Sequence, residues 1–156
     1  MIGRREFGVA GLSAAAWLAV EAAGVAKEKE RSTRSAKPAH DEHNEAFEEC
    51  AKACSDCQRA CDACATHCAH QLHAGKTEHM PTLATCLDCA DFCGTASQIT
   101  ARGGVFADLI CESCAEACAR CAKECEKISH DEHMAKCAKE CHDCETACRK
   151  LLKHVG

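Results

Sequence analysis

The sequence predicts an all-α protein, an antiparallel up-down-up-down four-helix bundle with a cysteine-lined core. Eighteen of the 156 residues are cysteine, and they fall in four separate runs. Within each run the steps alternate between three and four residues, which is the spacing of the buried seam of a bundled helix. Most other positions hold Ala, Glu or Lys, which favour helices with a charged outer face. The runs are Cys50, Cys54, Cys57, Cys61, Cys64 and Cys68; Cys86, Cys89 and Cys93; Cys111, Cys114, Cys118, Cys121 and Cys125; and Cys137, Cys141, Cys144 and Cys148.

Turn and capping residues separate the four predicted helices. Gly75 follows the first run, and Pro81 lies where it suits the first turn of the second helix. Gly103 and Gly104 separate the second helix from the third. The segment 129–132, Ser-His-Asp-Glu, has the pattern of a capping box that opens the fourth helix. Short connections of this kind predict antiparallel neighbours.

Residues 1–26 have the pattern of a twin-arginine signal peptide. Arg4 and Arg5 precede a short apolar stretch over 9–20, and small residues near 26 suit a cleavage site. An amphipathic N-terminal helix is the alternative. Residues 27–40 are charged and lack apolar periodicity, which predicts a flexible linker, and residues 41–156 form the predicted metal-storage domain. This interpretation predicts a periplasmic protein that is not attached to a membrane after cleavage.

The composition excludes several classes of protein. A formal net charge of −5 provides no basic surface for a nucleic acid or an anionic membrane. Only eleven Leu, Ile and Val residues follow position 26, so cysteine and alanine must line the interior. No Ser–His–Asp pattern, glycine-rich phosphate loop or paired-carboxylate site stands out, so the protein is not predicted to be an enzyme.

Metal binding explains cysteines on every seam better than the alternatives do. Leu or Val would bury more apolar area without the risk of oxidation. Neighbours on one helix face lie about 5–6 Å apart at Cβ, whereas a disulfide needs a Cβ separation of about 3.8 Å. Disulfides between helices, and iron–sulfur clusters bridged between helices, stay as alternatives. No discrete four-ligand zinc set, iron–sulfur motif or di-iron Glu-x-x-His motif stands out. Monovalent copper, which is soft and accepts two or three thiolates, suits the pattern best.

The cysteine-lined bundle behind an arginine pair resembles the bacterial copper storage proteins. The resemblance covers residues 41–156 and the export peptide, and its specific features are His67-Cys68 and the dense cysteine run that begins at Cys111. It implies many cuprous ions held by thiolates inside each bundle. It also implies tetramers among exported members, and an entrance for copper past His or Met at one end of the bundle. This chain is richer in cysteine than those members and poorer in methionine near the entrance.

Extension of the seams predicts which end of the bundle is the entrance. Where the first and third helices finish, steps of three and four residues reach His79, His130 and Met134, and His67 lies near by. These residues are the candidate copper ligands outside the cysteines, because imidazole and thioether can hold a cuprous ion weakly. The seams at the opposite end reach mostly apolar residues, beginning with Phe47, which predicts a closed end.

The predicted function is therefore copper storage, in which the cysteines hold several Cu(I) ions, limit copper toxicity and supply cuproenzymes. Thiolates that bridge ions predict on the order of 10–18 ions per chain, because two thiolates per ion would leave excess negative charge in the core. The alternatives are a scavenger of zinc, cadmium or silver, and a thiol–disulfide redox protein with an exposed Cys-x-x-Cys at a helix start. A homo-oligomer, a tetramer by the resemblance, is the expected assembly.

Overall fold

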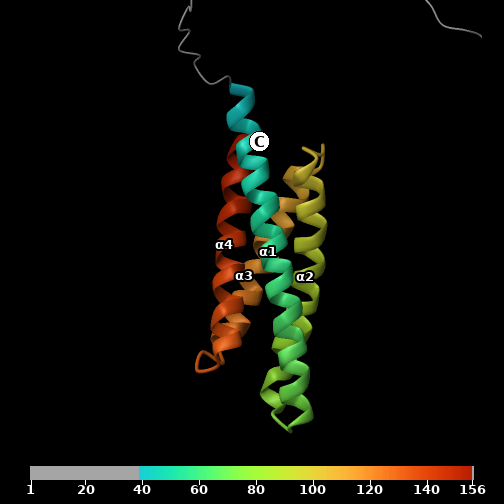
Figure 1. Ribbon diagram of the computed structural model, residues 1–156, viewed down its shortest axis with the longest axis vertical. Helices are drawn as coiled ribbons and strands as arrows, with labels where there is room; N and C mark the ends of the chain where they lie inside the picture. The colour runs from blue at the N-terminus through green and yellow to red at the C-terminus, as the bar shows by residue number, and fades with distance from the viewer. Residues whose placement is uncertain (1–38, 156) are drawn as a thin grey trace, which may run out of the picture. The chain divides into compact units, whose positions relative to one another are not determined.

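The computed structural model describes residues 39–155, with side chains from residue 45 onward, and this part of the chain is helical apart from its connections. The predicted signal peptide lies outside these residues, so the boundary at residue 26 stays a prediction. Helix α1 begins two residues before the predicted domain start at residue 41. The elements are α1 (Ala39–His73), a 3-10 helix (Thr77–His79), α2 (Met80–Ala101), α3 (Ala107–Glu126) and α4 (Glu132–Val155) (Figure 1).

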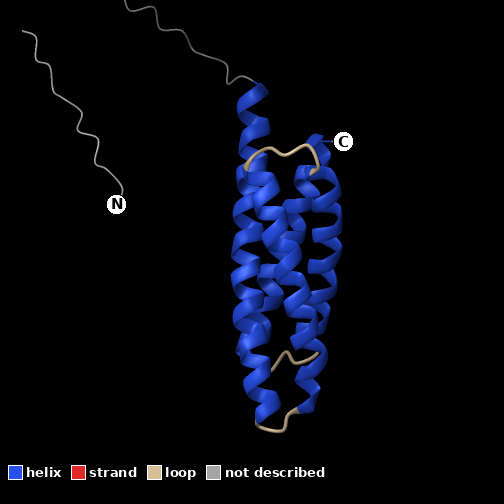
Figure 2. Ribbon diagram, turned by 90° about the vertical axis from the view of Figure 1, so that its right-hand side faces the viewer, coloured by secondary structure: helices blue, strands red, loops and turns tan. Residues whose placement is uncertain are grey.

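The four helices form the predicted antiparallel bundle. Helix α1 packs against α2 and α4, and α3 packs against the same two helices, so each helix has two neighbours around a common axis. The α1–α2 and α3–α4 connections lie at one end of the bundle, and the α2–α3 connection lies at the other end, beside the C-terminus (Figure 2). The predicted fold class is confirmed.

Two glycines end helices as the sequence predicts. Gly75, after α1, has φ +85°, and Gly103, after α2, has φ +59°, in the left-handed region where glycine carries no steric penalty. Pro81 lies in the first turn of α2, where its missing N–H costs no helical hydrogen bond. The sequence therefore encodes these ends locally.

The predicted cap of α4 is wrong by two residues. The Oδ1 atom of Asp131 accepts hydrogen bonds from the backbone N–H groups of His133 (2.9 Å) and Met134 (3.4 Å). Asp131 is thus the N-cap residue, and α4 begins at Glu132, directly after it. Ser129 is exposed in the connection before the helix. An aspartate caps a helix as well as a serine does, so the pattern alone did not distinguish the two residues.

Cysteine and alanine fill the core, as the shortage of larger apolar residues predicts. The end of the bundle at the α2–α3 connection, which we call the closed end, is filled by Phe47, Thr100 and Leu151, all buried. The Thr100 hydroxyl donates a hydrogen bond to the Ala96 carbonyl (2.8 Å), so its polar group is satisfied there. The charged outer face carries short-range ion pairs such as Lys139–Asp143 (2.5 Å). Among residues 39–155, none of the helices is both long and apolar enough to cross a membrane.

Candidate metal centre

All eighteen cysteines point into the bundle and are free thiols. Each is at most 1% exposed, because the alternating spacing of three and four residues keeps them on the inner face of each helix. The predicted cysteine seams are therefore present on all four helices. The interior is a continuous column of sulfur, with no water-exposed Cys-x-x-Cys pair among the described residues.

The shortest contacts between sulfur atoms join different helices. The shortest contacts join Cys93 to Cys118 and Cys54 to Cys144, both at 3.5 Å, whereas neighbours four residues apart on one helix lie at 3.9–4.0 Å. Two sulfurs that bind one ion at about 2.3 Å with tetrahedral angles lie about 3.8 Å apart. The spacing of the thiols therefore already allows two or more of them to bind the same metal ion.

These contacts group the sulfurs into overlapping sets of four, which the linear sequence did not reveal. Within each set all four sulfur atoms lie within 4.8 Å of one another. The sets overlap because single cysteines belong to two of them: Cys137 joins the first set to the second, Cys57 the third to the fourth, and Cys144 the fourth to the fifth. In order along the axis, five of the sets are Cys64, Cys86, Cys125 and Cys137; Cys61, Cys121, Cys137 and Cys141; Cys57, Cys61, Cys89 and Cys141; Cys57, Cys93, Cys118 and Cys144; and Cys54, Cys114, Cys144 and Cys148.

Hydrogen bonds between thiols couple their ionisation. The sulfurs of Cys114 and Cys118 lie 4.0 Å apart. The hydrogen bond with Cys118 is the main cause that lowers the pKa of Cys114, and the same contact raises the pKa of Cys118. At the other end of the column, burial raises the pKa of the Cys68 thiol. The column thus holds protons that a metal ion must displace, with the protons shared between sulfurs.

Three histidine rings gather at the end formed by the α1–α2 and α3–α4 connections, which we call the histidine end. The His67 ring stacks on that of His133 (centroids 4.3 Å apart) and meets the His79 ring edge-on at 5.9 Å. The Nε2 atom of His67 lies 2.8 Å from Oδ2 of Asp131. Partial burial opposes ionisation of Asp131, but this hydrogen bond and those from two backbone N–H groups outweigh it, so the pKa of Asp131 is lowered from its ordinary value. The negatively charged carboxylate of Asp131 therefore holds the His67 ring in place.

Two buried polar atoms at the histidine end have no hydrogen-bond partner among the residues that the structure describes. These are Nδ1 of His79 and Oγ1 of Thr82, on side chains that are 2% and 1% exposed. A buried polar atom without a partner costs free energy, so an unpaired imidazole nitrogen there is available to a ligand. Beside them Met134 is fully buried, with its Sδ atom 3.8 Å from Sγ of Cys64.

The structure brings together three of the four predicted ligands outside the cysteines. His67, His79 and Met134 all lie at the histidine end, next to the last sulfurs of the column. His130 is exposed in the connection before α4, and its role as a ligand stays a prediction. The ring that stacks on His67 is that of His133. Because α4 begins at Glu132, extending its period back to residue 130 passed beyond the helix.

A helical bundle filled with buried thiols in overlapping sets defines a thiolate store for soft metal ions. The chain belongs to the copper storage protein family, whose sequence pattern matches residues 43–153. The predicted family is confirmed, and so is the cargo: the bundle stores several Cu(I) ions on its cysteine thiolates. Among curated proteins, none matches the chain significantly.

Solved structures that are similar to this chain include the following three. A cytosolic copper storage protein from Streptomyces lividans with five coppers is 30% identical, covering 74% of this chain and 99% of its own, with a TM-score of 0.69. The S. lividans protein loaded with 10 copper equivalents is 30% identical, covering 79% and 94%, with a TM-score of 0.66. A protein from Nitrosospira multiformis is 32% identical, covering 71% and 98%, with a TM-score of 0.62.

The predicted periplasmic location is wrong by this comparison. The S. lividans protein shares the bundle and is described as cytosolic. The prediction depended on residues 1–26 alone, which lie outside the described part of the chain.

Proposed function

We propose that each chain is a non-catalytic store for on the order of 10–18 Cu(I) ions, with all eighteen cysteines as ligands. The observation that supports this proposal most directly is the series of overlapping four-cysteine sets. Because neighbouring sets share sulfurs, the column cannot be filled unless single thiolates bridge two ions. Bridging also matches the number of positive ions to the number of thiolates, which limits the charge buried in the core.

Copper enters at the histidine end in this proposal. His79 offers an unpaired buried nitrogen, and Met134 offers a sulfur 3.8 Å from Cys64, so weak ligands lead directly to strong ones. His133 takes the place predicted for His130. At the closed end the buried side chains of Phe47 and Leu151 fill the interior of the bundle instead.

Loading kinetics test this entrance. Replacing His79→Ala and Met134→Leu together slows loading from a Cu(I)–bicinchoninate complex and leaves the final stoichiometry unchanged. The matched control, Phe47→Leu at the closed end, loads at the wild-type rate. If the Phe47→Leu variant loads slowly instead, copper enters at the closed end. If both variants load at the wild-type rate, the histidine end is not the route.

The assembly belongs to the same proposal. The outer face of α2 presents Met80, Leu87 and Phe92 to solvent, a feature that favours burial against another molecule. We expect this face of α2 to pack against a second copy of the chain within a homotetramer. Light scattering of the wild type is expected to give a tetramer, and Leu87→Glu with Phe92→Glu a smaller species. A monomeric wild type would remove the tetramer from the proposal.

Thiol titration separates storage from its alternatives. After denaturation of the reduced wild type, a thiol reagent should react with all eighteen cysteines. The reaction should be slow in the native state and slowest when Cu(I) is bound. A redox protein would show one rapidly reacting pair in the native state. A general soft-metal scavenger would take up zinc or cadmium in competition with excess Cu(I).

A further inference from the structure

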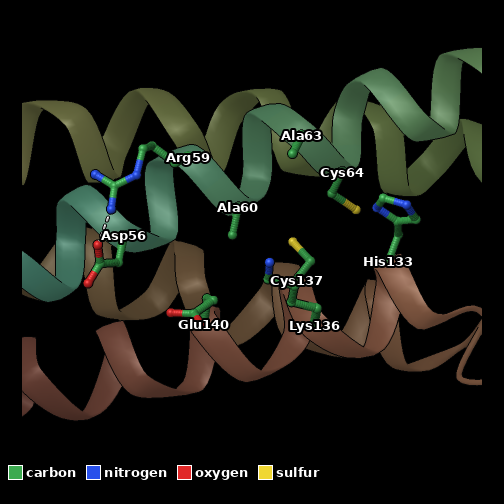
Figure 3. Close-up of a pocket in the computed structure, with 9 residues that line it drawn as sticks. All are labelled: Asp56, Arg59, Ala60, Ala63, Cys64, His133, Lys136, Cys137 and Glu140. Atoms are coloured by element: carbon green, nitrogen blue, oxygen red, sulfur yellow. Dashed lines mark hydrogen bonds and ion pairs between the residues drawn. The ribbon is translucent and has the colours of Figure 1, made fainter.

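A groove on the side of the bundle opens onto the sulfur column near the histidine end. It lies between α1 and α4 and has a volume of about 350 Å³ (Figure 3). Pockets that bind small molecules start at about 300 Å³, so the groove is large enough to hold a small molecule. Its lining consists of Asp56, Arg59, Ala60, Ala63, Cys64, His133, Lys136, Cys137 and Glu140.

Two cysteines from facing helices lie at the base of this groove. Figure 3 shows the side chains of Cys64 and Cys137 reaching into the space between α1 and α4. Both are 1% exposed, and their sulfurs belong to one set of four with Cys86 and Cys125. Ala60 lines the groove beside them, and its small side chain leaves the space open. The groove thus reaches two strong copper ligands, although neighbouring atoms cover almost all of their surface.

Charged side chains of both signs line the groove. Arg59 and Lys136 carry positive charge, and Asp56 and Glu140 carry negative charge. Arg59 forms an ion pair with Asp56, whereas Lys136 and Glu140 lie on the α4 wall. Arg59 precedes Cys64 by five residues, a rise of about 7–8 Å along α1. A molecule of that length could place a thiol at the sulfurs while its carboxylate and ammonium groups meet opposite charges.

We propose that this groove docks a small zwitterionic thiol that carries Cu(I), and that the ion passes from it to Cys64 and Cys137. The inference depends on the proposed storage function and names a donor class for it. The size of the groove admits such a donor, and the mixed charge of its rim and the cysteines at its base favour it over an uncharged chelator.

The transfer is a ligand exchange that needs no oxidant or reductant. The bond between copper and the donor sulfur breaks as a bond to the Cys64 sulfur forms, and copper stays in the +1 state. The Cys64 thiol proton passes to the released donor thiolate, so charge and atoms balance. Because Cys137 also lies 3.8 Å from Cys61, the ion can then move into the next set of the column.

Two copper donors and three variants test the inference. Ala60→Leu with Ala63→Leu fills the groove, and Lys136→Glu reverses a charge on its rim without adding bulk. Both variants are expected to load about tenfold more slowly from Cu(I)–glutathione, the loss that about 1.4 kcal/mol of docking free energy would give. Loading from the larger Cu(I)–bicinchoninate complex, and the final stoichiometry, should stay at wild-type values.

The matched control lies on the opposite side of the bundle. A pocket of about 360 Å³ between α2 and α3 reaches Cys89, and Ala117→Leu fills it without touching the groove. This control should load from both donors at the wild-type rate. Wild-type loading of the two groove variants from Cu(I)–glutathione would overturn the inference, as would equal slowing from both donors. Failure of the wild type to take up copper from either donor would instead refute the storage proposal.

Discussion

Removing the Asp131 side chain should destabilise the metal-free bundle by about 2 kcal/mol. Its Oδ1 atom accepts two backbone N–H groups at the start of α4, and an N-cap of this kind contributes about 1 kcal/mol. Its Oδ2 atom binds His67 in a partly buried contact at 2.8 Å, which adds about 1 kcal/mol. Asp131→Ala loses both contributions, whereas Asp131→Asn keeps an acceptor for the cap and should lose less.

Urea unfolding of the reduced, metal-free protein, followed by circular dichroism, measures this loss. With a slope of about 1–3 kcal/mol per molar urea, the midpoint of Asp131→Ala should fall by roughly 1 M. Ser129→Ala is the matched control and should stay within about 0.5 kcal/mol of the wild type. An equal loss of stability in Asp131→Ala and Ser129→Ala, or a wild-type midpoint for Asp131→Ala, would refute the assignment of the cap.

The stability that the Asp131 carboxylate contributes should depend on pH. The pKa of Asp131 is lowered in the folded protein, so its ionised form stabilises the fold at pH values above the unfolded pKa of about 3.9. This contribution is lost as the pH falls through the lower pKa of the folded state. The difference in stability between the wild type and Asp131→Asn should therefore shrink in acid, and a difference that grew in acid would contradict the assignment.

Three further outcomes are expected. Leu151→Ala, at a fully buried position of the closed end, should lower the free energy of unfolding by about 2–5 kcal/mol, and a loss below about 1 kcal/mol would show that this end is loosely packed. Gly75→Ala should cost about 1 kcal/mol through its backbone alone, because no atom lies within 4 Å of an added Cβ, and an unchanged melting temperature would refute this. Cu(I) binding should weaken as the pH falls and release protons, because burial raises the pKa of thiols such as Cys68, and competition titrations that show no pH dependence would contradict protonated thiols.

The sequence predicts the fold and the cysteine seams because both are local properties. A period of three and four residues defines the inner face of a helix without reference to its neighbours, and glycines such as Gly75 mark helix ends through their own backbone conformation. The identity of the cargo followed from the same seams, since sulfur on every inner face leaves few other functions.

The arrangement between helices could not be predicted in the same way. The four-cysteine sets combine residues from three or four helices, so they depend on how the helices are shifted along one another. His133 was not chosen because its ring is placed by stacking on His67 of another helix, and His130 was chosen because its period was extended past the start of α4. The groove above Cys64 depends on the same packing and leaves no pattern in the sequence.

The number of cuprous ions bound per chain tests the central claim most directly. Anaerobic titration of the reduced protein with Cu(I) against a competing chelator, with the saturated species weighed by native mass spectrometry, measures it. Thiolates that bridge ions along the shared sets predict saturation on the order of 10–18 ions per chain. Saturation at about one to four ions would show that the column contains only discrete sites and would contradict the storage proposal.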